Sequence, residues 1–351
     1  MKTEQDILEQ VRNAATSATP LNIEGGGSKR FYGRSSSGAT LATGAHSGII
    51  DYTPSELVVS ARAGTPLAEL ETALGEEGQM LAFEPPHFGA HATLGGSIAC
   101  GLSGPRRPWS GAARDFVLGI TCINGKGERL RFGGQVMKNV AGYDLSRTLT
   151  GSLGTLAVLL EIHLRVLPRP EHELTLTREC STAEAIRHSS AWSGRPLPLS
   201  GACHIDGCLH VRLSGSRQGV QAAAAKIGGD SHPQSASFWE QLREQQLAFF
   251  AGDRPLWRIS VPPASTPLEL DGDWLLDWGG AQRWLRSELP AIDIRDHTTA
   301  AGGHATLFRG GNRDTEIFQP LQPALLALHQ RLKHSFDPGG ILNPGRMYPG
   351  L

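Results

Sequence analysis

The stretch that decides the fold is "PPHFGAHATLGGSIACGLSGPRRPWSG", which runs from Pro85 to Gly111. It is rich in glycine and proline, and its charged side chains are those of Arg106 and Arg107. Glycine loses more backbone freedom on folding than any other residue, so this concentration has an entropic cost that needs a reason. We expect that the backbone itself is the binding group, and that the ligand is a large cofactor containing phosphate.

Two further glycine clusters flank this stretch: "EGGGSKRFYG", Glu24 to Gly33, and "GYDLSRTLTGSLGTLAV", Gly142 to Val158. Successive glycines after a strand can turn consecutive N–H groups into one concavity, which suits a phosphate oxygen. The sequence has no P-loop, because Gly127 follows Gly125-Lys126 where Ser or Thr is required, and the first cluster is not a G-x-G-x-x-G fingerprint. The alternative for each cluster is an ordinary surface turn.

Hydrophobic periodicity predicts alternating helices and strands around these clusters. Residues 3–18 are predicted to form a helix capped by Thr3, and residues 65–74 a second helix capped by Thr65. Asn124-Gly125 between two strand-like runs predicts a β-hairpin. In residues 156–167 apolar and polar side chains alternate, which predicts a strand with one buried face in an antiparallel sheet.

The composition excludes several classes of protein. The net charge is −1 with no basic stripe, so we expect no nucleic-acid partner. The N-terminal residues lack the apolar core of a secretory signal, and no apolar run has the length of a membrane span. The five cysteines are scattered and odd in number, which indicates free thiols in a reducing compartment, and we expect a cytoplasmic protein.

The order and spacing of the glycine clusters resemble the FAD-binding domain of the vanillyl-alcohol oxidase/p-cresol methylhydroxylase (PCMH) superfamily. The resemblance covers residues 1–170 and the tail "FDPGGILNPGRMYPG", Phe336 to Gly350. Within that superfamily, the tail and the run "MKNVAGYDLSRTLTGSLGTLAVLLEIHLRVLP" are similar to the FAD-binding subunits of bacterial glycolate oxidases. The resemblance implies an α+β fold in which two α/β subdomains hold FAD in an extended conformation.

Pro168 and Pro170 mark a domain boundary, because the pattern of predicted helices and strands changes after them. We expect a PCMH-type FAD-binding domain in residues 1–170 and a smaller α+β, cap-like domain in residues 171–310. Residues 311–351 would form a helix, with a stripe of Leu325, Leu328 and Leu332, and a tail that packs back on the FAD domain.

The resemblance also implies which residues bind FAD. Contacts to the pyrophosphate would come from Gly25, Gly26, Gly27, Ser28 and Lys29. The wall along the flavin and pyrophosphate would comprise Pro85, Pro86, Thr93, Leu94, Gly95, Gly96, Gly101, Ser103, Gly104 and Gly111. The adenine side would be closed by Gly154, Thr155 and Leu156, and the tail would contribute Asn343 and Arg346.

Some members of this superfamily attach FAD covalently through a histidine beside the first glycine loop, but the first histidine here is His46. His87 and His91 lie in the second cluster, so attachment there stays open, although we expect non-covalent FAD. Their i,i+4 spacing suits zinc only on a helix, which Pro85, Pro86 and Gly89 oppose. "CHIDGCLH", Cys203 to His210, alternates like a strand and lacks a second cysteine pair, so no metal site is expected.

Candidates for substrate chemistry are weak. A flavin-dependent oxidation of a 2-hydroxy acid needs a cation for the carboxylate and a base for the hydroxyl proton. "IRDHTTAAGGHATLFRGG" offers Arg295, His297, His304 and Arg309, but these residues can equally be structural. The catalytic residues are therefore left unassigned.

The sequence predicts an FAD-binding subunit of a glycolate oxidase, which oxidises glycolate to glyoxylate. The implied partners are a homologous catalytic flavoprotein and an iron–sulfur subunit that relays electrons toward quinone, because this chain has no C-x2-C spacing for a cluster. Contact with the inner face of the membrane would come through those partners. The alternatives are a self-sufficient FAD-dependent 2-hydroxy-acid oxidase and an assembly subunit whose FAD site has decayed.

Overall fold

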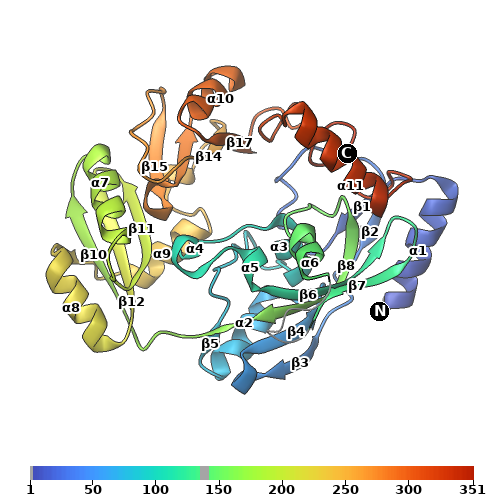
Figure 1. The fold of residues 1–351 in the computed structure, drawn as a ribbon, viewed down its shortest axis with the longest axis horizontal. Coiled ribbons are helices and arrows are strands. Elements are labelled where there is room, and N and C mark those ends of the chain that lie inside the picture. Colours follow the sequence, from blue (N-terminus) through green and yellow to red (C-terminus); the bar gives the residue numbers. More distant parts are fainter. Residues whose placement is uncertain (1–2, 135–141) are drawn as a thin grey trace.

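The computed structural model of the chain describes residues 3–134 and 142–351. A five-stranded and an eight-stranded sheet lie side by side, and the C-terminal segment returns to the N-terminal part (Figure 1). The elements up to residue 168 are α1 (Glu4–Ser17), β1 (Leu21–Glu24), β2 (Ala39–Ala42), β3 (Ile49–Thr53), η1 (Pro54–Glu56), β4 (Val58–Arg62), α2 (Leu67–Glu76), β5 (Gln79–Met80), α3 (Leu94–Cys100), α4 (Arg107–Ser110), α5 (Ala113–Phe116), β6 (Val117–Asn124), β7 (Arg129–Gly133), α6 (Tyr143–Leu149), β8 (Ala157–Arg165) and β9 (Leu167–Pro168).

The remaining elements build the eight-stranded sheet and the C-terminal helix. They are β10 (His172–Glu179), α7 (Thr182–Ser193), β11 (Leu199–Ile205), β12 (Cys208–Gly215), α8 (Arg217–Ile227), β13 (Asp230–Ser231), α9 (Ser235–Arg243), η2 (Ala248–Phe250), β14 (Leu256–Ser260), β15 (Asp273–Asp277), η3 (Trp278–Gly280), β16 (Gln282–Arg286), α10 (Ala291–Ala300), β17 (His304–Arg309) and α11 (Pro323–Phe336).

The five-stranded sheet has the order β3-β4-β8-β6-β7 and is antiparallel throughout. Every residue of β6 is buried, because the sheet is covered on both faces. One face packs on a core that includes Leu70, Phe83 and Phe116. The other face meets α1, whose Ile7 and Val11 are fully buried. This double cover holds β8, whose first residues belong to the third glycine cluster.

The eight-stranded sheet has the order β13-β10-β12-β11-β15-β16-β14-β17. Helices α7, α8 and α10 pack on one of its faces. The opposite face carries α9 and an aromatic cluster that includes Trp284 and Phe308, and it meets Tyr32 and Leu102 of the N-terminal part. The eight-stranded sheet is thus joined to loops of the N-terminal part through side chains of this face.

The C-terminal segment pairs directly with β1. Leu21 N donates to the carbonyl of Ile341 at 2.7 Å, and Asn343 N donates to the carbonyl of Leu21 at 2.9 Å. A parallel bridge joins Leu21 and Leu342. The return of the tail to the FAD-binding part, which the resemblance implied, is therefore seen in the hydrogen bonding.

Several local expectations were wrong. Strand β8 is buried on both faces, because register shifts against β6 split its apolar residues between two cores, and His163 is buried with its Nδ1 2.7 Å from Ser60 Oγ. Pro66 occupies the cap position of α2, while the hydroxyl of Thr65 bonds to the backbone of Gly48. The helix with the leucine stripe is found as α11, in which Leu332 packs against the core and Leu325 and Leu328 are 43% and 51% exposed.

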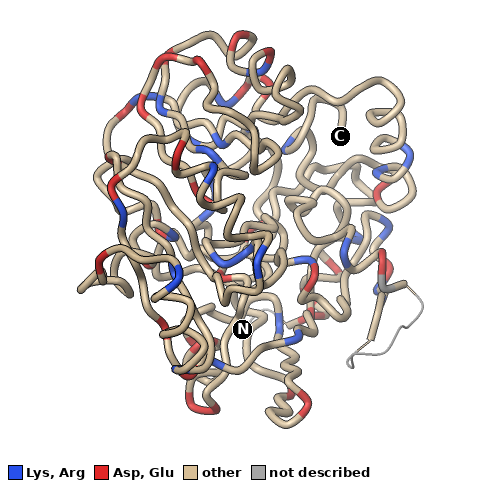
Figure 2. Tube along the Cα trace, turned by 60° about the vertical axis from the view of Figure 1, so that its left-hand side comes forward, with Lys and Arg blue, Asp and Glu red and all other residues tan. Residues whose placement is uncertain are grey.

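The charges are distributed as the sequence predicts. Figure 2 shows basic and acidic residues interspersed along the chain trace, without a one-signed stripe on the described residues. Within residues 3–134 and 142–351, no helix is both long enough and apolar enough to cross a membrane.

Candidate functional site

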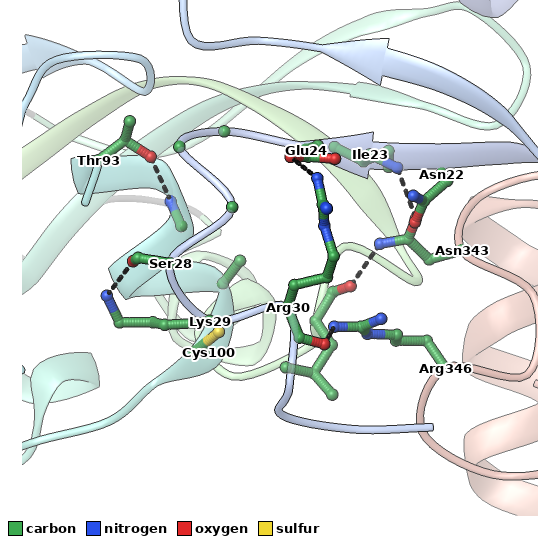
Figure 3. Close-up of a pocket in the computed structure, with 16 residues that line it drawn as sticks. Asn22, Ile23, Glu24, Ser28, Lys29, Arg30, Thr93, Cys100, Asn343 and Arg346 are labelled. Atoms are coloured by element: carbon green, nitrogen blue, oxygen red, sulfur yellow. Dashed lines mark hydrogen bonds and ion pairs between the residues drawn. The ribbon is translucent and has the colours of Figure 1, made fainter. Parts of the chain in front are cut away.

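A cavity of about 600 Å³, which we call the loop cavity, lies where the first glycine cluster, α3 and the tail meet (Figure 3). It is lined by Asn22, Ile23, Glu24, Gly25, Gly26, Gly27, Ser28, Lys29, Arg30, Thr93, Gly96, Ala99, Cys100, Leu153, Asn343 and Arg346.

The backbone of the first glycine cluster offers a run of unused donors. Among the described residues, no acceptor makes a hydrogen bond with the N–H groups from Gly25 to Lys29. Backbone donors left without a protein partner are satisfied by water or by a ligand. Five consecutive free N–H groups at a cavity are a fitting cradle for a pyrophosphate.

The glycines at positions 25 and 26 also have a packing reason. A Cβ at Gly26 would lie 1.4 Å from the carbonyl oxygen of His91, and one at Gly25 would lie 2.4 Å from Thr93 Oγ1. The loop therefore rests on residues 91–93, and these two glycines allow that close approach. This close packing positions the loop against residues 91–93.

Helix α3 forms a wall of the loop cavity, but its first N–H groups are already used. Leu94 N donates to Thr65 O at 2.9 Å, Gly95 N to Ala63 O at 2.7 Å, and Gly96 N to Thr93 Oγ1 at 3.2 Å. A Cβ at Gly96 would meet only Thr93 Oγ1, at 3.1 Å. Gly96 thus keeps the wall flat, whereas the donors come from the loop.

Two cations without a carboxylate partner face the same cavity, in addition to Arg30, which pairs with Glu24. Lys29 is 7% exposed, its Nζ donates to the carbonyl of His87 at 3.1 Å, and burial lowers its pKa. Arg346 donates from Nη2 to the carbonyls of Arg30 and Tyr32, both at 2.9 Å. Neither side chain is within ion-pair distance of a carboxylate in the described part of the chain. A buried cation without a carboxylate favours an anionic ligand.

Asn343 fastens the tail to the cavity wall. Its Nδ2 donates to Leu153 O at 2.7 Å, and its Oδ1 accepts from Ile23 N at 2.7 Å. Its positive φ of 42° is one that asparagine tolerates better than most residues. Asn343 therefore joins β1, the third glycine cluster and the tail, and its role is to position the wall.

A second cavity of about 360 Å³ lies between the Pro85–Gly111 stretch and the eight-stranded sheet, and we call it the sheet cavity. It is lined by Pro86, Phe88, Leu102, Ser103, Gly104, Pro105, Leu242, Arg243, Gln245, Arg258, Asp277, Gln282, Trp284 and Phe308. The Gly104 carbonyl accepts from Trp278 Nε1 at 3.0 Å, which joins the stretch to the sheet at the rim of this cavity.

The predicted FAD-binding residues divide between the two cavities. The loop cavity brings together Gly25, Gly26, Gly27, Ser28, Lys29, Thr93, Gly96, Asn343 and Arg346. The sheet cavity brings together Pro86, Ser103 and Gly104. The lining of neither cavity includes Pro85, Leu94, Gly95, Gly101, Gly111, Gly154, Thr155 or Leu156.

The weak catalytic candidates do not meet at either cavity. His297 lies on the exposed surface of α10, and His304 is exposed at the start of β17. Arg309 stacks over the ring of Phe31 at 4.5 Å. Arg295 is buried and donates to the carbonyl oxygens of Glu316 and Phe318, so its role is structural.

Sequence reasoning missed the polar residues of the sheet cavity. Arg258 lies in β14, Asp277 in β15 and Gln245 between α9 and η2, and no motif links them in the sequence. The "CHIDGCLH" segment is not the single strand that its alternation predicted, because the chain turns at Asp206 and Gly207 and the segment forms a hairpin of β11 and β12. Within the described residues, no three side chains of metal-ligand type form a candidate metal site.

The comparisons with known proteins agree with this geometry. Residues 1–133 match the FAD binding domain family, and residues 310–347 match the C-terminal domain of FAD linked oxidases. The chain is similar, with 15% identity and a TM-score of 0.70, to a solved alkyldihydroxyacetonephosphate synthase, covering 97% of this chain and 75% of that one. That likeness concerns the fold.

Two curated relatives carry the assignment further. Over 85 residues the chain is 40% identical to the glycolate oxidase subunit GlcD of Bacillus subtilis (strain 168), covering 24% of this chain and 18% of that protein. Over 347 residues it is 52% identical to the glycolate oxidase subunit GlcE of Escherichia coli (strain K12), covering 99% of this chain and 98% of that protein. The chain therefore belongs to the GlcE family of glycolate oxidase subunits, and it is an FAD-dependent oxidoreductase of the FAD-linked oxidase type.

Proposed function

We propose that this chain is the FAD-binding subunit of a multi-subunit complex that oxidises glycolate to glyoxylate. The observation that carries the proposal is the run of unpaired backbone N–H groups from Gly25 to Lys29 beside two cations. The names of the relatives in E. coli and B. subtilis supply the substrate and the existence of other subunits.

The residues of the loop cavity would divide the work of holding FAD. The loop N–H groups and the side chains of Lys29 and Arg346 would bind the pyrophosphate, and Gly96 would leave a flat wall beside it. When bound, FAD accepts a hydride from the carbon that carries the substrate hydroxyl. The Ser103-Gly104 turn, at the sheet cavity, would lie toward the flavin end.

Non-covalent binding fits the surroundings of the nearby histidines. His87 Nε2 lies 3.0 Å from Glu71 Oε2, and His91 is exposed. Neither side chain is among those that line the loop cavity. We expect the cofactor to be released from denatured protein.

The partners would be a homologous catalytic flavoprotein and an iron–sulfur subunit. All five cysteines are free thiols, and no cluster-type ligand group occurs in the described residues. Electrons that leave the flavin toward a quinone would therefore pass through another chain. In this proposal the protein is cytoplasmic and reaches the membrane only through those partners.

The decisive experiment compares two matched glycine substitutions. Gly96 is the third residue of α3, and its N–H is capped by Thr93; Gly219 is the third residue of α8, and its N–H is capped by Ser216 at 3.2 Å. A Cβ at Gly219 would lie 3.0 Å from the capping oxygen, much as at Gly96, but Gly219 faces solvent. Both substitutions by valine therefore make similar local demands on the helix.

We expect Gly96→Val to lose bound FAD while it folds normally, because the new methyl groups project into the loop cavity. Gly219→Val should keep FAD at the wild-type ratio, as measured by flavin absorbance against protein absorbance after desalting. A yellow Gly96→Val protein would place the cofactor elsewhere. A wild-type chain that takes up no FAD would instead favour the alternative of a decayed site.

A further inference from the structure

The sheet cavity has a polar side formed by neighbouring strands. Arg258 of β14 pairs in register with Trp284 of β16, and Asp277 of β15 pairs with Gln282 of β16. Residues paired across strands, and those two positions along a strand, share a face. Because Trp284 and Gln282 are two residues apart, all four side chains lie on one face of the sheet, and all four line the cavity.

Gln245 has unused hydrogen-bonding capacity at this cavity. Gln245 is 8% exposed, and its Oε1 has no partner among the described residues. A buried polar atom without a partner costs about 1–3 kcal/mol, which makes an unseen ligand or water the natural explanation. Its backbone φ of 55° is also in the left-handed region, so the side chain is held at the cavity by an unusual turn.

Arg258 provides a cation at the same cavity. Its guanidinium makes a long contact from Nη2 to the hydroxyl of Tyr32, at 3.3 Å, and lies 5.8 Å from the ring centres of Tyr32 and Phe308. No carboxylate lies within ion-pair distance of it in the described part of the chain. Aromatic walls lower the local dielectric, which strengthens the attraction of such a cation for an anion.

Asp277 places a carboxyl group in the same lining. Its Oδ1 accepts from Trp278 N at 2.7 Å, and its Oδ2 accepts from Gln282 Nε2 at 3.2 Å. Burial raises its pKa to about 7, with a further contribution from the charge of Glu84. A carboxyl group poised near neutrality can take a proton from a ligand hydroxyl.

We propose that the sheet cavity binds a small 2-hydroxycarboxylate, with Arg258 holding the carboxylate and with Gln245 Oε1 accepting the one hydrogen bond that the hydroxyl can donate, beside the carboxyl group of Asp277. The inference rests on the proposed function for the identity of the acid, which would be glycolate. It adds that this chain itself contains a site for the acid, in place of the unassigned candidates His297, His304 and Arg309.

The charge of the acid is tested by a binding measurement that needs no turnover. Glycolate and the neutral analogue glycolamide are titrated into the FAD-loaded chain, and the heat of binding reports the affinity. Arg258→Met should weaken glycolate binding by roughly 10- to 100-fold, the range for a lost charge-assisted hydrogen bond. The matched control Arg254→Met removes an exposed arginine that pairs with Asp273 and should bind glycolate as the wild type does.

The hydroxyl is tested by comparing glycolate with acetate. The wild type should prefer glycolate, and Gln245→Leu should reduce that preference several-fold while leaving acetate binding nearly unchanged. Should Arg258→Met fail to fold, Arg258→Lys replaces it, and a weakening of glycolate binding relative to the wild type is expected there too.

The inference is overturned if the FAD-loaded wild type does not bind glycolate, if it binds glycolamide equally well, or if the Arg258 variants bind glycolate normally. FAD content is measured on the same samples. A chain that holds FAD but not glycolate would defeat this inference and leave the proposed function intact, whereas a chain without FAD would defeat the proposed function.

Discussion

Replacing Lys333 with methionine should detach the tail from the wall of the loop cavity. Lys333 lies in the last turn of α11, and its Nζ donates to Thr155 O at 2.7 Å, to Leu342 O at 2.8 Å and to Asp337 Oδ2 at 2.7 Å. Asp337 in turn accepts from the N–H groups of Ile341 and Leu342. One ammonium group therefore joins the helix, the third glycine cluster and the tail.

The size of the expected destabilisation follows from the burial of the ion pair between Lys333 and Asp337. Lys333 is 7% exposed and Asp337 is 1% exposed, so the variant leaves a carboxylate and two carbonyl oxygens buried without their cation. Removing one partner of a buried ion pair costs about 3–5 kcal/mol. The loss should appear locally, because the contacts concern only the last turn of α11 and residues 337–343.

Hydrogen exchange of the Ile341 and Leu342 amides is the suitable assay, since it reports the free energy of local opening. Their exchange should accelerate by roughly 100- to 1,000-fold or more in Lys333→Met. Lys226→Met is the control, because Lys226 lies in the last turn of α8 and is exposed. Unchanged protection of Leu342 in Lys333→Met would refute the assigned role of this lysine.

Two further predictions concern the carboxyl groups between the sheets. The pKa of Asp277 is raised to about 7 in the folded protein, so the folded state holds the carboxyl proton more tightly than the unfolded state does. The free energy of unfolding should therefore fall by about 4 kcal/mol as the pH rises from about 4 to above 7. In urea unfolding, Asp277→Asn should not show this pH-dependent loss of stability. Burial alone would raise the pKa of Glu84, but Arg212 and Arg106 lower it, so its contribution is present above its usual pKa and is lost on acidification. Glu84→Gln should lower stability at pH 7 by about 3 kcal/mol in the same assay, and equal stability would contradict this role of Glu84.

Much of the N-terminal fold was predictable because its signals are local. The Thr3 cap, the Asn124-Gly125 hairpin and the strand after Gly154 each depend on a few neighbouring residues, and each was found close to its predicted place. The error at β8 came from register shifts, which depend on the partner strand and leave no mark on the sequence of β8 itself.

The two cavities also differ in how much of each could be predicted from the sequence. The glycine loop at residues 25–29 was recognisable because its donors are contiguous, although the packing of Gly26 on His91 could be known only from the structure. The residue run from Met137 carried part of the resemblance, and its residues 137–141 lie outside the described residues. Arg258 and Asp277 could not be predicted, because strand register alone brings them to one face.

The bond between Ile23 and Asn343 spans 320 residues of chain. During synthesis, β1 and the glycine loop leave the ribosome long before the residue that closes their edge exists. At a synthesis rate of roughly 5–20 residues per second, that interval lasts on the order of tens of seconds. Cofactor loading should thus be a late, post-translational event, and nascent chains arrested before Asn343 should not retain flavin.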